Sequence, residues 1–284
     1  MAATSGPRLD YGIDAPRAVF ALVVLGAASG LAALCLGLGL PGLPGGLAAA
    51  TLAVLAADLL AVAAAFLWYS RAGKLRQRDR LLDLLRWGGD ETVLDVGCGR
   101  GLLLIGAAGR LSGGRAVGVD IWSQVDLSGN RPEATRENAR REGVAGRVEV
   151  RDGDARHLPF ADATFDVVVS SLVLHNIPGQ EDRRRAVREV ARVLKPGGRV
   201  ALLDLRHTGD YVRVLRQCGL ADARRLPAGF FFTWLFPLLT WGAVRFYRVT
   251  GNKGGRSTGT VSVYKSGNLV TDSQRPTQGG QLPI

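Results

Sequence analysis

The chain has 284 residues, of which 36 are Lys or Arg and 25 are Asp or Glu, giving a formal net charge of +11. This length suits one domain with appended segments, and 47% hydrophobic with 21% charged residues excludes a chain disordered throughout. The basic excess is almost all arginine, spread along an Ala- and Gly-rich chain, so it indicates compositional bias and predicts no nucleic-acid partner. The three cysteines, Cys35, Cys98 and Cys218, are too far apart to indicate a disulfide framework or a zinc site.

The N-terminal quarter after residues 1–17 is strongly apolar. Ala18–Leu40 and Leu47–Tyr69 are each long enough to cross a bilayer, and the turn-forming run Pro41–Gly46 separates them. The pattern therefore predicts a transmembrane helical hairpin over residues 18–69. A cleaved signal peptide would have a shorter apolar core and no second span. Gly26 and Gly30 form a G-x-x-x-G pair that would let the two helices pack closely.

Basic residues flank the hairpin and are absent from its turn. Lys and Arg resist translocation, so both ends are expected on the cytoplasmic side. The residues concerned are Arg8 and Arg17 before the first span, and Arg71, Lys74, Arg76, Arg78 and Arg80 after the second. Trp68 and Tyr69 suit an interfacial aromatic belt. Asp58 lies at the centre of the second span, where insertion costs roughly 2.5 to 3.5 kcal/mol. Its carboxyl is either hydrogen-bonded inside the hairpin or functional.

A soluble domain is expected over residues 71–250. It opens with an amphipathic helix that carries Leu75, Leu81, Leu82, Leu84 and Leu85. The strand Thr92–Val96 then leads through a glycine-rich turn, residues 97–101, into a helix over Leu102–Leu111. A second strand over Arg115–Val119 ends at Asp120, nineteen residues after Gly101, which suits a carboxylate that binds ribose hydroxyls. The turn is G-x-G-x-G rather than G-x-G-x-x-G, so a dinucleotide cofactor is disfavoured.

Five motifs in this domain carry a resemblance to a known family. They are Val93-Leu94-Asp95-Val96-Gly97-Cys98-Gly99-Arg100-Gly101, Gly118-Val119-Asp120-Ile121, Gly153-Asp154-Ala155, Phe165-Asp166-Val167-Val168-Val169-Ser170 and Leu194-Lys195-Pro196-Gly197-Gly198. In this order and at these distances they resemble class I S-adenosylmethionine-dependent methyltransferases over about residues 75 to 227. The similarity is greatest to small-molecule enzymes of the ubiquinone/menaquinone biosynthesis methyltransferase type.

The resemblance implies an α/β fold: a Rossmann-like, seven-stranded, mostly parallel sheet, preceded here by the two-helix hairpin. It also implies S-adenosylmethionine as cofactor. Asp95 and the backbone of Gly97, Gly99 and Gly101 would hold the methionine portion, and Ser170 would line that end. Asp120 would hold the ribose, Ile121 would pack on the adenine, and Asp154 would accept the adenine amino group beside Ala155. Asp166 and the run Lys195–Gly198 are expected to be structural, the latter as a turn.

The methyl acceptor is harder to predict. The fourth strand is followed by Ser171-Leu172-Val173-Leu174-His175-Asn176, which lacks the Pro-Pro and aromatic pattern of base-amino methyltransferases. A base for the acceptor's proton should lie beyond the carboxyl ends of the strands. We expect His175 and His207 to converge there with Tyr211 nearby, the alternative for each histidine being a hydrogen bond to a loop. His157 is expected in a loop beside the adenine. Asp204, on the fifth strand, either supports a residue of the site or has a purely structural role. Trp122, in a loop over residues 121–131, would stack on the cofactor or cap the core.

Two C-terminal segments lie outside this resemblance. Residues 226–244 are uncharged and rich in Phe and Trp, which favours a membrane-proximal interfacial insertion. Burial against the sheet and a third span are the alternatives. A last strand is expected over Val244–Thr250. Residues 251–284 are expected to form a flexible tail, with at most a weak hairpin around Ser266-Gly267-Asn268.

The sequence therefore predicts a membrane-anchored methyltransferase with a small, lipophilic acceptor such as a quinone or a lipid-like phenol. Two alternatives stay open: a tethered methyltransferase for a soluble metabolite, and a membrane scaffold that binds the cofactor without turnover. The sequence predicts no metal and gives no oligomeric state.

Overall fold

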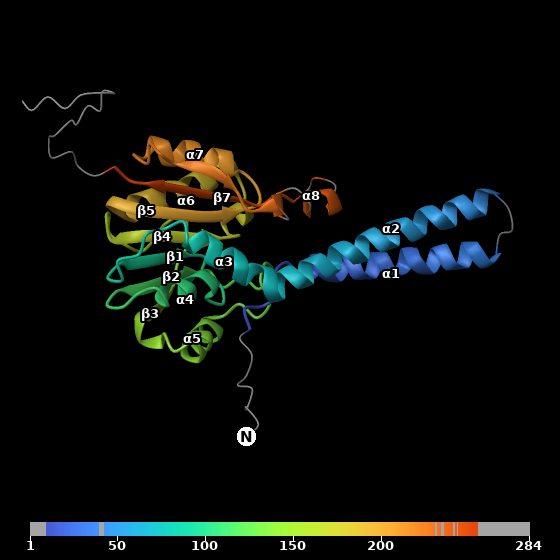
Figure 1. The fold of residues 1–284 in the computed structure, drawn as a ribbon, viewed down its shortest axis with the longest axis horizontal. Helices are drawn as coiled ribbons and strands as arrows, with labels where there is room; N and C mark the ends of the chain where they lie inside the picture. Colours follow the sequence, from blue (N-terminus) through green and yellow to red (C-terminus); the bar gives the residue numbers. More distant parts are fainter. Residues whose placement is uncertain are drawn as a thin grey trace, which may run out of the picture.

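The computed structural model describes residues 10–39, 43–230, 232–233, 236–240, 242 and 244–254. A long helical hairpin projects from one end of a layered α/β domain (Figure 1). The hairpin consists of α1 (Pro16–Gly39) and α2 (Leu43–Trp68). Helix α2 continues through a π-helical turn, η1 (Tyr69–Gly73), into α3 (Lys74–Leu82), which packs on the domain.

The two hairpin helices pack closely along their small residues. A Cβ added at Gly26 would lie 2.9 Å from the side chain of Leu60, so a larger residue there would push the helices apart. Both helices are long and apolar enough to cross a bilayer, and only 17% of the most apolar window of each is buried. The expected turn over Pro41–Gly46 is wrong for its second half, because α2 already begins at Leu43. Residues 40–42 lie outside the described residues.

The sheet has seven strands, as predicted, and their order is β3-β2-β1-β4-β5-β7-β6. Strands β1 to β5 pair in parallel and β7 is antiparallel to both neighbours. The strands are β1 (Thr92–Val96), β2 (Arg115–Asp120), β3 (Val148–Asp152), β4 (Phe165–Ser171), β5 (Leu194–Asp204), β6 (Arg224–Pro227) and β7 (Tyr247–Asn252).

Two strands differ from the sequence prediction. The run Lys195–Gly198 was expected to be a turn, but it lies inside β5, where the pairing with β4 is irregular and Gly197 adopts a φ of +79°. The glycine therefore relieves a bulge within the strand rather than ending it. The last strand, β7, begins at Tyr247 rather than Val244 and includes Gly251 and Asn252, which were expected in the tail. Residues 255–284, with the possible hairpin, lie outside the described residues.

Helices cover both faces of the sheet (Figure 1). Helices α3, α4 (Leu102–Ala108) and α5 (Pro132–Arg141) bury their apolar side chains in one core. Helices α6 (Gln180–Val193) and α7 (Thr208–Gln217) bury theirs in a second core on the opposite face. Two 3-10 turns, η2 (Ala145–Arg147) and η3 (Leu174–Asn176), precede β3 and follow β4. The carboxyl ends of the parallel strands thus stay open between these layers.

The aromatic segment 226–244 packs where the hairpin meets the domain. The ring of Phe232 lies 5.4 Å from that of Tyr69, and the ring of Phe236, in α8 (Phe236–Leu239), lies 5.4 Å from that of Phe66. Both Phe232 and Phe236 are buried. The described part of the segment therefore packs beside the base of the hairpin, while Phe231, Trp234 and Trp241 lie outside the described residues.

Candidate functional site

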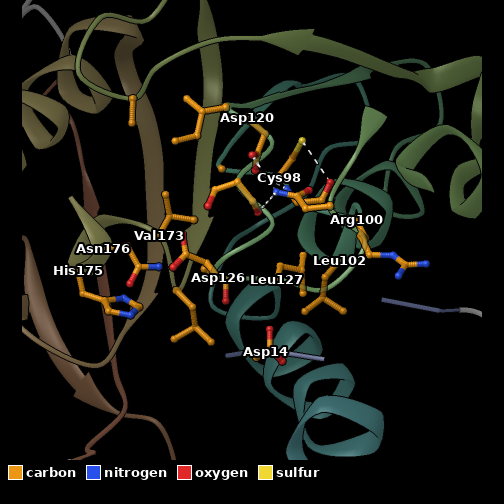
Figure 2. Close-up of a pocket in the computed structure, with 18 of the residues that line it drawn as sticks. Asp14, Cys98, Arg100, Leu102, Asp120, Asp126, Leu127, Val173, His175 and Asn176 are labelled. Carbon is orange, nitrogen blue, oxygen red and sulfur yellow. Dashed lines mark hydrogen bonds between the residues drawn. The ribbon is translucent and has the colours of Figure 1, made fainter. Parts of the chain in front are cut away.

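A cavity of about 410 Å³ lies at the carboxyl ends of β1, β2 and β4. Figure 2 shows side chains from the glycine turn, the loop after β2 and the segment after β4 pointing into it. Its size is that of a small-molecule site. Residues from the N-terminal segment and from the base of the hairpin complete the wall; they include Tyr11, Asp14, Phe66, Tyr69 and Lys74.

The glycine turn brings bare backbone to one wall of the cavity. Gly97, Gly99 and Gly101 have φ angles of +71°, +53° and +88°, a region that other residues rarely adopt. A Cβ at Gly97 would lie 2.3 Å from Val173. Gly97 and Gly99 line the cavity, but Gly101 does not; it precedes α4 and packs against Ile105 and Thr135. Gly101 therefore lies outside the cavity lining, in the turn that leads into α4.

Asp120 is held firmly in the cavity wall. Its Oδ2 accepts a hydrogen bond from the backbone N–H of Gly99 at 2.8 Å, and its Oδ1 accepts from the N–H of Trp122 at 2.6 Å. Asn130 Nδ2 also donates to Oδ1, at 3.1 Å, while the Asn130 Oδ1 is buried without a partner among the described residues. The side chain of Ile121 is 69% exposed and lines the same cavity. A carboxylate, an unpaired amide oxygen and an apolar side chain here fit a ribose with an attached base.

Asp95 lies deeper in the same wall. Its Oδ2 accepts a hydrogen bond from the N–H of Leu104 at 2.8 Å, which anchors the start of α4. Burial raises the pKa of Asp95 to about 8, because few groups compensate the loss of solvation. The cavity therefore holds a carboxyl that would ionise readily beside a cationic ligand.

Asp154 and Ala155, which were expected beside the adenine, also line the cavity, but the carboxylate of Asp154 is already engaged. Arg156 Nη2 lies 2.6 Å from Asp154 Oδ2, and hydrogen bonding to Arg156 lowers the pKa of Asp154 below its ordinary value. An adenine amino group would have to share this carboxylate with Arg156, a lining residue that the sequence reasoning missed.

Ser170 does not lie where the sequence suggested. Its hydroxyl is buried and donates to the carbonyl oxygen of Val96 at 2.7 Å, joining β4 to β1. The next residue, Ser171, lines the cavity instead, because side chains alternate along a strand. Trp122 also misses the cavity: its indole N–H donates to Asp152 at 2.6 Å.

The three predicted base candidates separate in the structure. His175 lines the cavity, and its Nδ1 lies 2.5 Å from Asp204 Oδ1. Tyr211 is buried away from the cavity and its hydroxyl donates to Asp204 Oδ2 at 3.1 Å, so it supports Asp204. Burial, together with the neighbouring Asp204 carboxylate, raises the pKa of Tyr211 far above its ordinary value. His207 lines a different hollow, because the chain turns there at a φ of +60° to start α7. His175 and His207 therefore do not converge.

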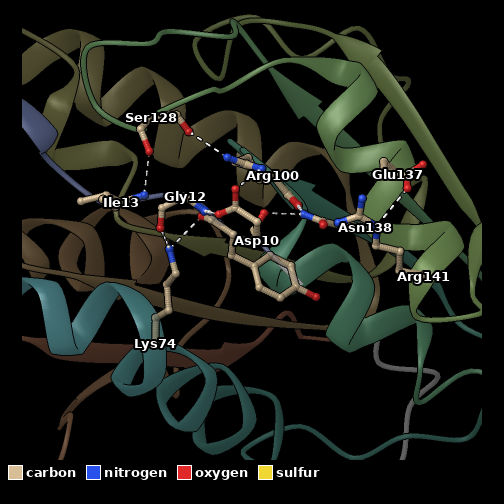
Figure 3. A network of polar contacts seen from close by, with 10 residues as sticks. Asp10, Gly12, Ile13, Lys74, Arg100, Ser128, Glu137, Asn138 and Arg141 are labelled. Atoms are coloured by element: carbon tan, nitrogen blue, oxygen red, sulfur yellow. Dashed lines mark hydrogen bonds and ion pairs between the residues drawn. The ribbon is translucent and has the colours of Figure 1, made fainter. Parts of the chain in front are cut away.

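The N-terminal segment Asp10–Ala15, which sequence reasoning missed, forms a strap across the site (Figure 3). Lys74 is buried, and its Nζ donates to the carbonyl oxygens of Tyr11 and Gly12 at 2.7 and 2.6 Å. Lys74 was expected in the basic membrane-proximal cluster, but these contacts place it in the domain interior. Arg100, in the glycine turn, binds Asp10 at 2.8 Å.

The strap also contacts the loop over residues 121–131. Ile13 N–H donates to the Ser128 hydroxyl at 2.8 Å, and Ala15 N–H donates to the Asp126 carbonyl at 2.9 Å. No local sequence pattern predicts contacts between residues that are more than 100 positions apart. The strap thus joins the start of α1 directly to the cavity wall.

Apart from Asp14 and Lys74, the side of the cavity next to the hairpin is lined mainly by apolar and aromatic side chains. Phe66 and Tyr69 come from the base of the hairpin, and Leu172, Leu205 and Phe246 come from the loops after β4 and β5 and from the residue before β7. The ring of Tyr69 lies 5.2 Å from that of Phe246. One continuous cavity therefore extends from the glycine turn to the base of the hairpin.

Comparison with known proteins bears on the central part of this domain. Residues 94–202 match a family model described as a methyltransferase domain. This part of the chain is therefore similar to methyltransferase domains. The match includes the glycine turn, Asp120, Asp154 and His175, but neither the hairpin nor the strap.

Curated relatives share about half of their length with this chain. The 27-O-demethylrifamycin SV methyltransferase of Amycolatopsis mediterranei is 37% identical over 152 residues, which are 53% of this chain and 50% of that protein. The demethylmenaquinone methyltransferase of Lactiplantibacillus plantarum is 38% identical over 113 residues, or 39% and 44% of the two chains. The ubiquinone/menaquinone biosynthesis C-methyltransferase of Klebsiella pneumoniae is 36% identical over 120 residues, or 40% and 42%.

Solved structures are more distant. The geranyl diphosphate C-methyltransferase of Streptomyces coelicolor A3(2) is 18% identical and aligns with a TM-score of 0.47, over 63% of this chain and 78% of that chain.

Proposed function

We propose that this protein is a membrane-anchored methyltransferase that transfers the methyl group of S-adenosylmethionine to a small, lipophilic acceptor of the quinone or phenol class. The observation that carries this proposal is the course of the cavity. It begins at the glycine turn, where the cofactor would bind, and ends among Phe66 and Tyr69 at the base of the apolar hairpin. An acceptor dissolved in the bilayer would reach the site without crossing water.

The cofactor end would hold S-adenosylmethionine through residues of the first two strands. Gly97 and Gly99 would present backbone, Asp120 would accept from the ribose hydroxyls, and Ile121 would pack on the adenine. Asp154 and Ala155 would border the base, while Asp95 would lie toward the methionine portion. Ser170 and Gly101 support this wall from behind, through the Val96 carbonyl and the start of α4.

The acceptor's proton would pass to His175. When bound, S-adenosylmethionine supplies an electrophilic methyl group, whose in-line displacement depends mainly on alignment, with reacting atoms roughly 3 to 3.5 Å apart. Asp204 orients His175 by lying against Nδ1 and by accepting from the backbone N–H of the same residue at 3.0 Å. That arrangement leaves Nε2 as the atom to accept a proton from a hydroxyl or an activated carbon in the cavity.

The hairpin would place this site at a membrane surface. Its helices expose large apolar side chains such as Phe20, Leu38, Leu47 and Val54, which water would solvate poorly. Arginines after α2, including Arg71 and Arg76, favour a cytoplasmic location for the domain. The aromatic segment 226–244 would lie in the interface beside the base of the hairpin. The lipophilic acceptor is consistent with relatives named for menaquinone and ubiquinone biosynthesis.

The test is to incubate membranes carrying the full chain with methyl-labelled S-adenosylmethionine and to partition the product. Label in the organic phase, dependent on Asp120, supports the proposal. Label in the aqueous phase would instead indicate a tethered enzyme for a soluble metabolite. Cofactor binding without product from lipid extracts of the source cells would indicate a scaffold. Resistance of the chain to alkaline carbonate extraction tests the anchor separately.

A further inference from the structure

A second hollow, of about 640 Å³, lies beside the first and is lined with arginines. It lies between the start of α7, strand β6 and the segment that precedes β7. We call it the basic hollow and define it by Arg206, Arg213, Arg225 and Arg245. Some of the arginines that the sequence analysis assigned to compositional bias therefore lie together in this hollow.

Positive charge in the basic hollow is poorly balanced by the protein. One carboxylate, that of Asp210, lines it, and Asp210 already binds Arg184 at 3.0 Å and Arg213 at 2.6 Å. Among the described residues, no carboxylate forms an ion pair with Arg206, Arg225 or Arg245. The guanidinium of Arg225 lies over the ring of Tyr247, 4.3 Å from its centre. Three arginines are therefore left to face an external anion.

The positive charge of the basic hollow also affects the pKa of His207, which lines it. Burial and the charges of Arg183 and Arg206 lower the pKa of His207, and they outweigh the opposing carboxylates of Asp204 and Asp210. Of these causes, the charge of Arg206 belongs to the basic hollow, so the hollow contributes part of this lowering.

The hollow also lies next to the base of the hairpin. Arg245 directly precedes Phe246, whose ring lies 5.2 Å from that of Tyr69, in the turn that continues α2. Gly242, another lining residue, follows α8 closely, and α8 contacts α2. Figure 1 shows α8 beside the end of α2 that meets the sheet. With the hairpin in a bilayer, the basic hollow would open at the level of the headgroups.

We propose that the basic hollow binds the phosphate of an anionic phospholipid headgroup. This inference rests on the proposed insertion of the hairpin into a membrane. Guanidinium groups bind phosphate oxygens in pairs, and a cytoplasmic leaflet rich in anionic lipid offers such phosphates beside basic residues. A bound headgroup would fix the tilt of the domain and hold the apolar end of the cavity against the bilayer.

A soluble phosphate group is the competing ligand of the same chemistry. Leu205 lines both the basic hollow and the main cavity, so a phosphate on the acceptor itself would reach the arginines from inside. The position of Arg245 at the base of the hairpin favours the lipid, and the experiment separates the two sources.

The experiment uses the full chain purified in mixed micelles that contain equal amounts of phosphatidylglycerol and phosphatidylcholine. The phospholipid that remains bound after gel filtration is quantified by mass spectrometry. We expect phosphatidylglycerol to be enriched, and Arg225→Gln/Arg245→Gln to reduce the enrichment at least tenfold, at about fivefold per arginine. The control, Arg115→Gln/Arg185→Gln, removes the same charge from exposed positions on β2 and α6 and should keep the enrichment.

Equal retention of the two lipids by the unmodified chain would overturn the proposal, as would equal enrichment in the two double variants. Calorimetric titration with glycerol 1-phosphate provides the second arm: saturable binding that needs Arg225 and Arg245, without lipid preference, would also overturn it. Binding of S-adenosylhomocysteine, measured on every variant, shows that each is folded. Methyl transfer is assayed on the same preparations. Lipid retention then reports on the headgroup site, and the transfer assay reports separately on the proposed reaction.

Discussion

The two ends of the main cavity are built in different ways. The cofactor end comes from neighbouring pieces of chain: Gly97, Gly99 and Asp120 lie within 25 residues of one another, and the backbone N–H of Gly99 donates to the carboxylate of Asp120. The hairpin end joins Tyr69, Leu205 and Phe246, which are far apart in the sequence. The residues of the first end lie within the range that matches the methyltransferase family model, whereas the second depends on how this chain attaches its hairpin. Chemistry and access are thus separable by mutation.

His175 lies between the two ends, and its removal should have the largest effect. His175→Ala should lower kcat by roughly 10² to 10⁴, the usual contribution of a general base, and leave the dissociation constant of S-adenosylhomocysteine unchanged. His207→Ala, outside the cavity, should leave kcat within about twofold. Steady-state kinetics with calorimetry check both. An equal loss of kcat in the two variants would contradict the separation of the two histidines and would favour the original expectation that both contact the acceptor.

At the cofactor end, Asp120→Asn should weaken S-adenosylhomocysteine binding by roughly 10- to 100-fold. The change removes a charged acceptor, and hydrogen bonds to charged groups contribute about 1.5 to 3 kcal/mol. Asp83→Asn, at an exposed carboxylate beside Arg110, is the matched control and should bind normally. Unchanged affinity in Asp120→Asn, measured by calorimetry, would refute the assignment of the ribose site.

Asp95 predicts a pH dependence of stability. In the folded, ligand-free protein burial raises its pKa to about 8, from an ordinary value of 3.8. Between these values the unfolded chain has released the proton that the folded chain retains, so this stability contribution falls as pH rises toward 8. From pH 6 to pH 8 the loss should be about 2 kcal/mol. In urea unfolding, the free energy of unfolding of Asp95→Asn should rise relative to that of the unmodified chain over this pH range. A difference between the two free energies that does not depend on pH would contradict the buried, protonated state.

At the hairpin end, truncation should alter acceptor use alone. Phe66→Ala removes part of the apolar lining and should raise the KM for a long-chain acceptor about tenfold, in keeping with the roughly 1.5 to 3 kcal/mol gained by burying such a side chain. The KM for a short, water-soluble analogue and the affinity for the cofactor should stay unchanged in this variant. A parallel rise for both acceptors would show that the two ends of the cavity are not independent.

Local sequence pattern predicted the backbone around the glycine turn well. The strand Thr92–Val96, the glycine turn and the strand that ends at Asp120 were expected, because periodicity and turn chemistry act over short distances. The seven-stranded sheet was implied by the family resemblance and is confirmed. The errors concern side-chain direction and partners. Ser170 bonds to the Val96 carbonyl, and Gly101 packs behind the turn, although both belong to the expected motifs.

The strap and the separation of the histidines had no comparable signal. Lys74 looked like one basic residue in a membrane-proximal cluster, and only the fold brings it under the carbonyls of Tyr11 and Gly12. His207 follows its strand as His175 does, but it turns away with the first residue of α7. Such contacts depend on how distant segments pack, which periodicity and spacing do not encode.

The most direct test is calorimetric titration of the full chain in detergent with S-adenosylhomocysteine. It asks whether the glycine turn and Asp120 form the binding site for the methyl donor. The account predicts saturable heat for one site per chain, strongly reduced in Asp120→Asn. Absence of heat from folded protein, or equal heat from both proteins, would contradict it.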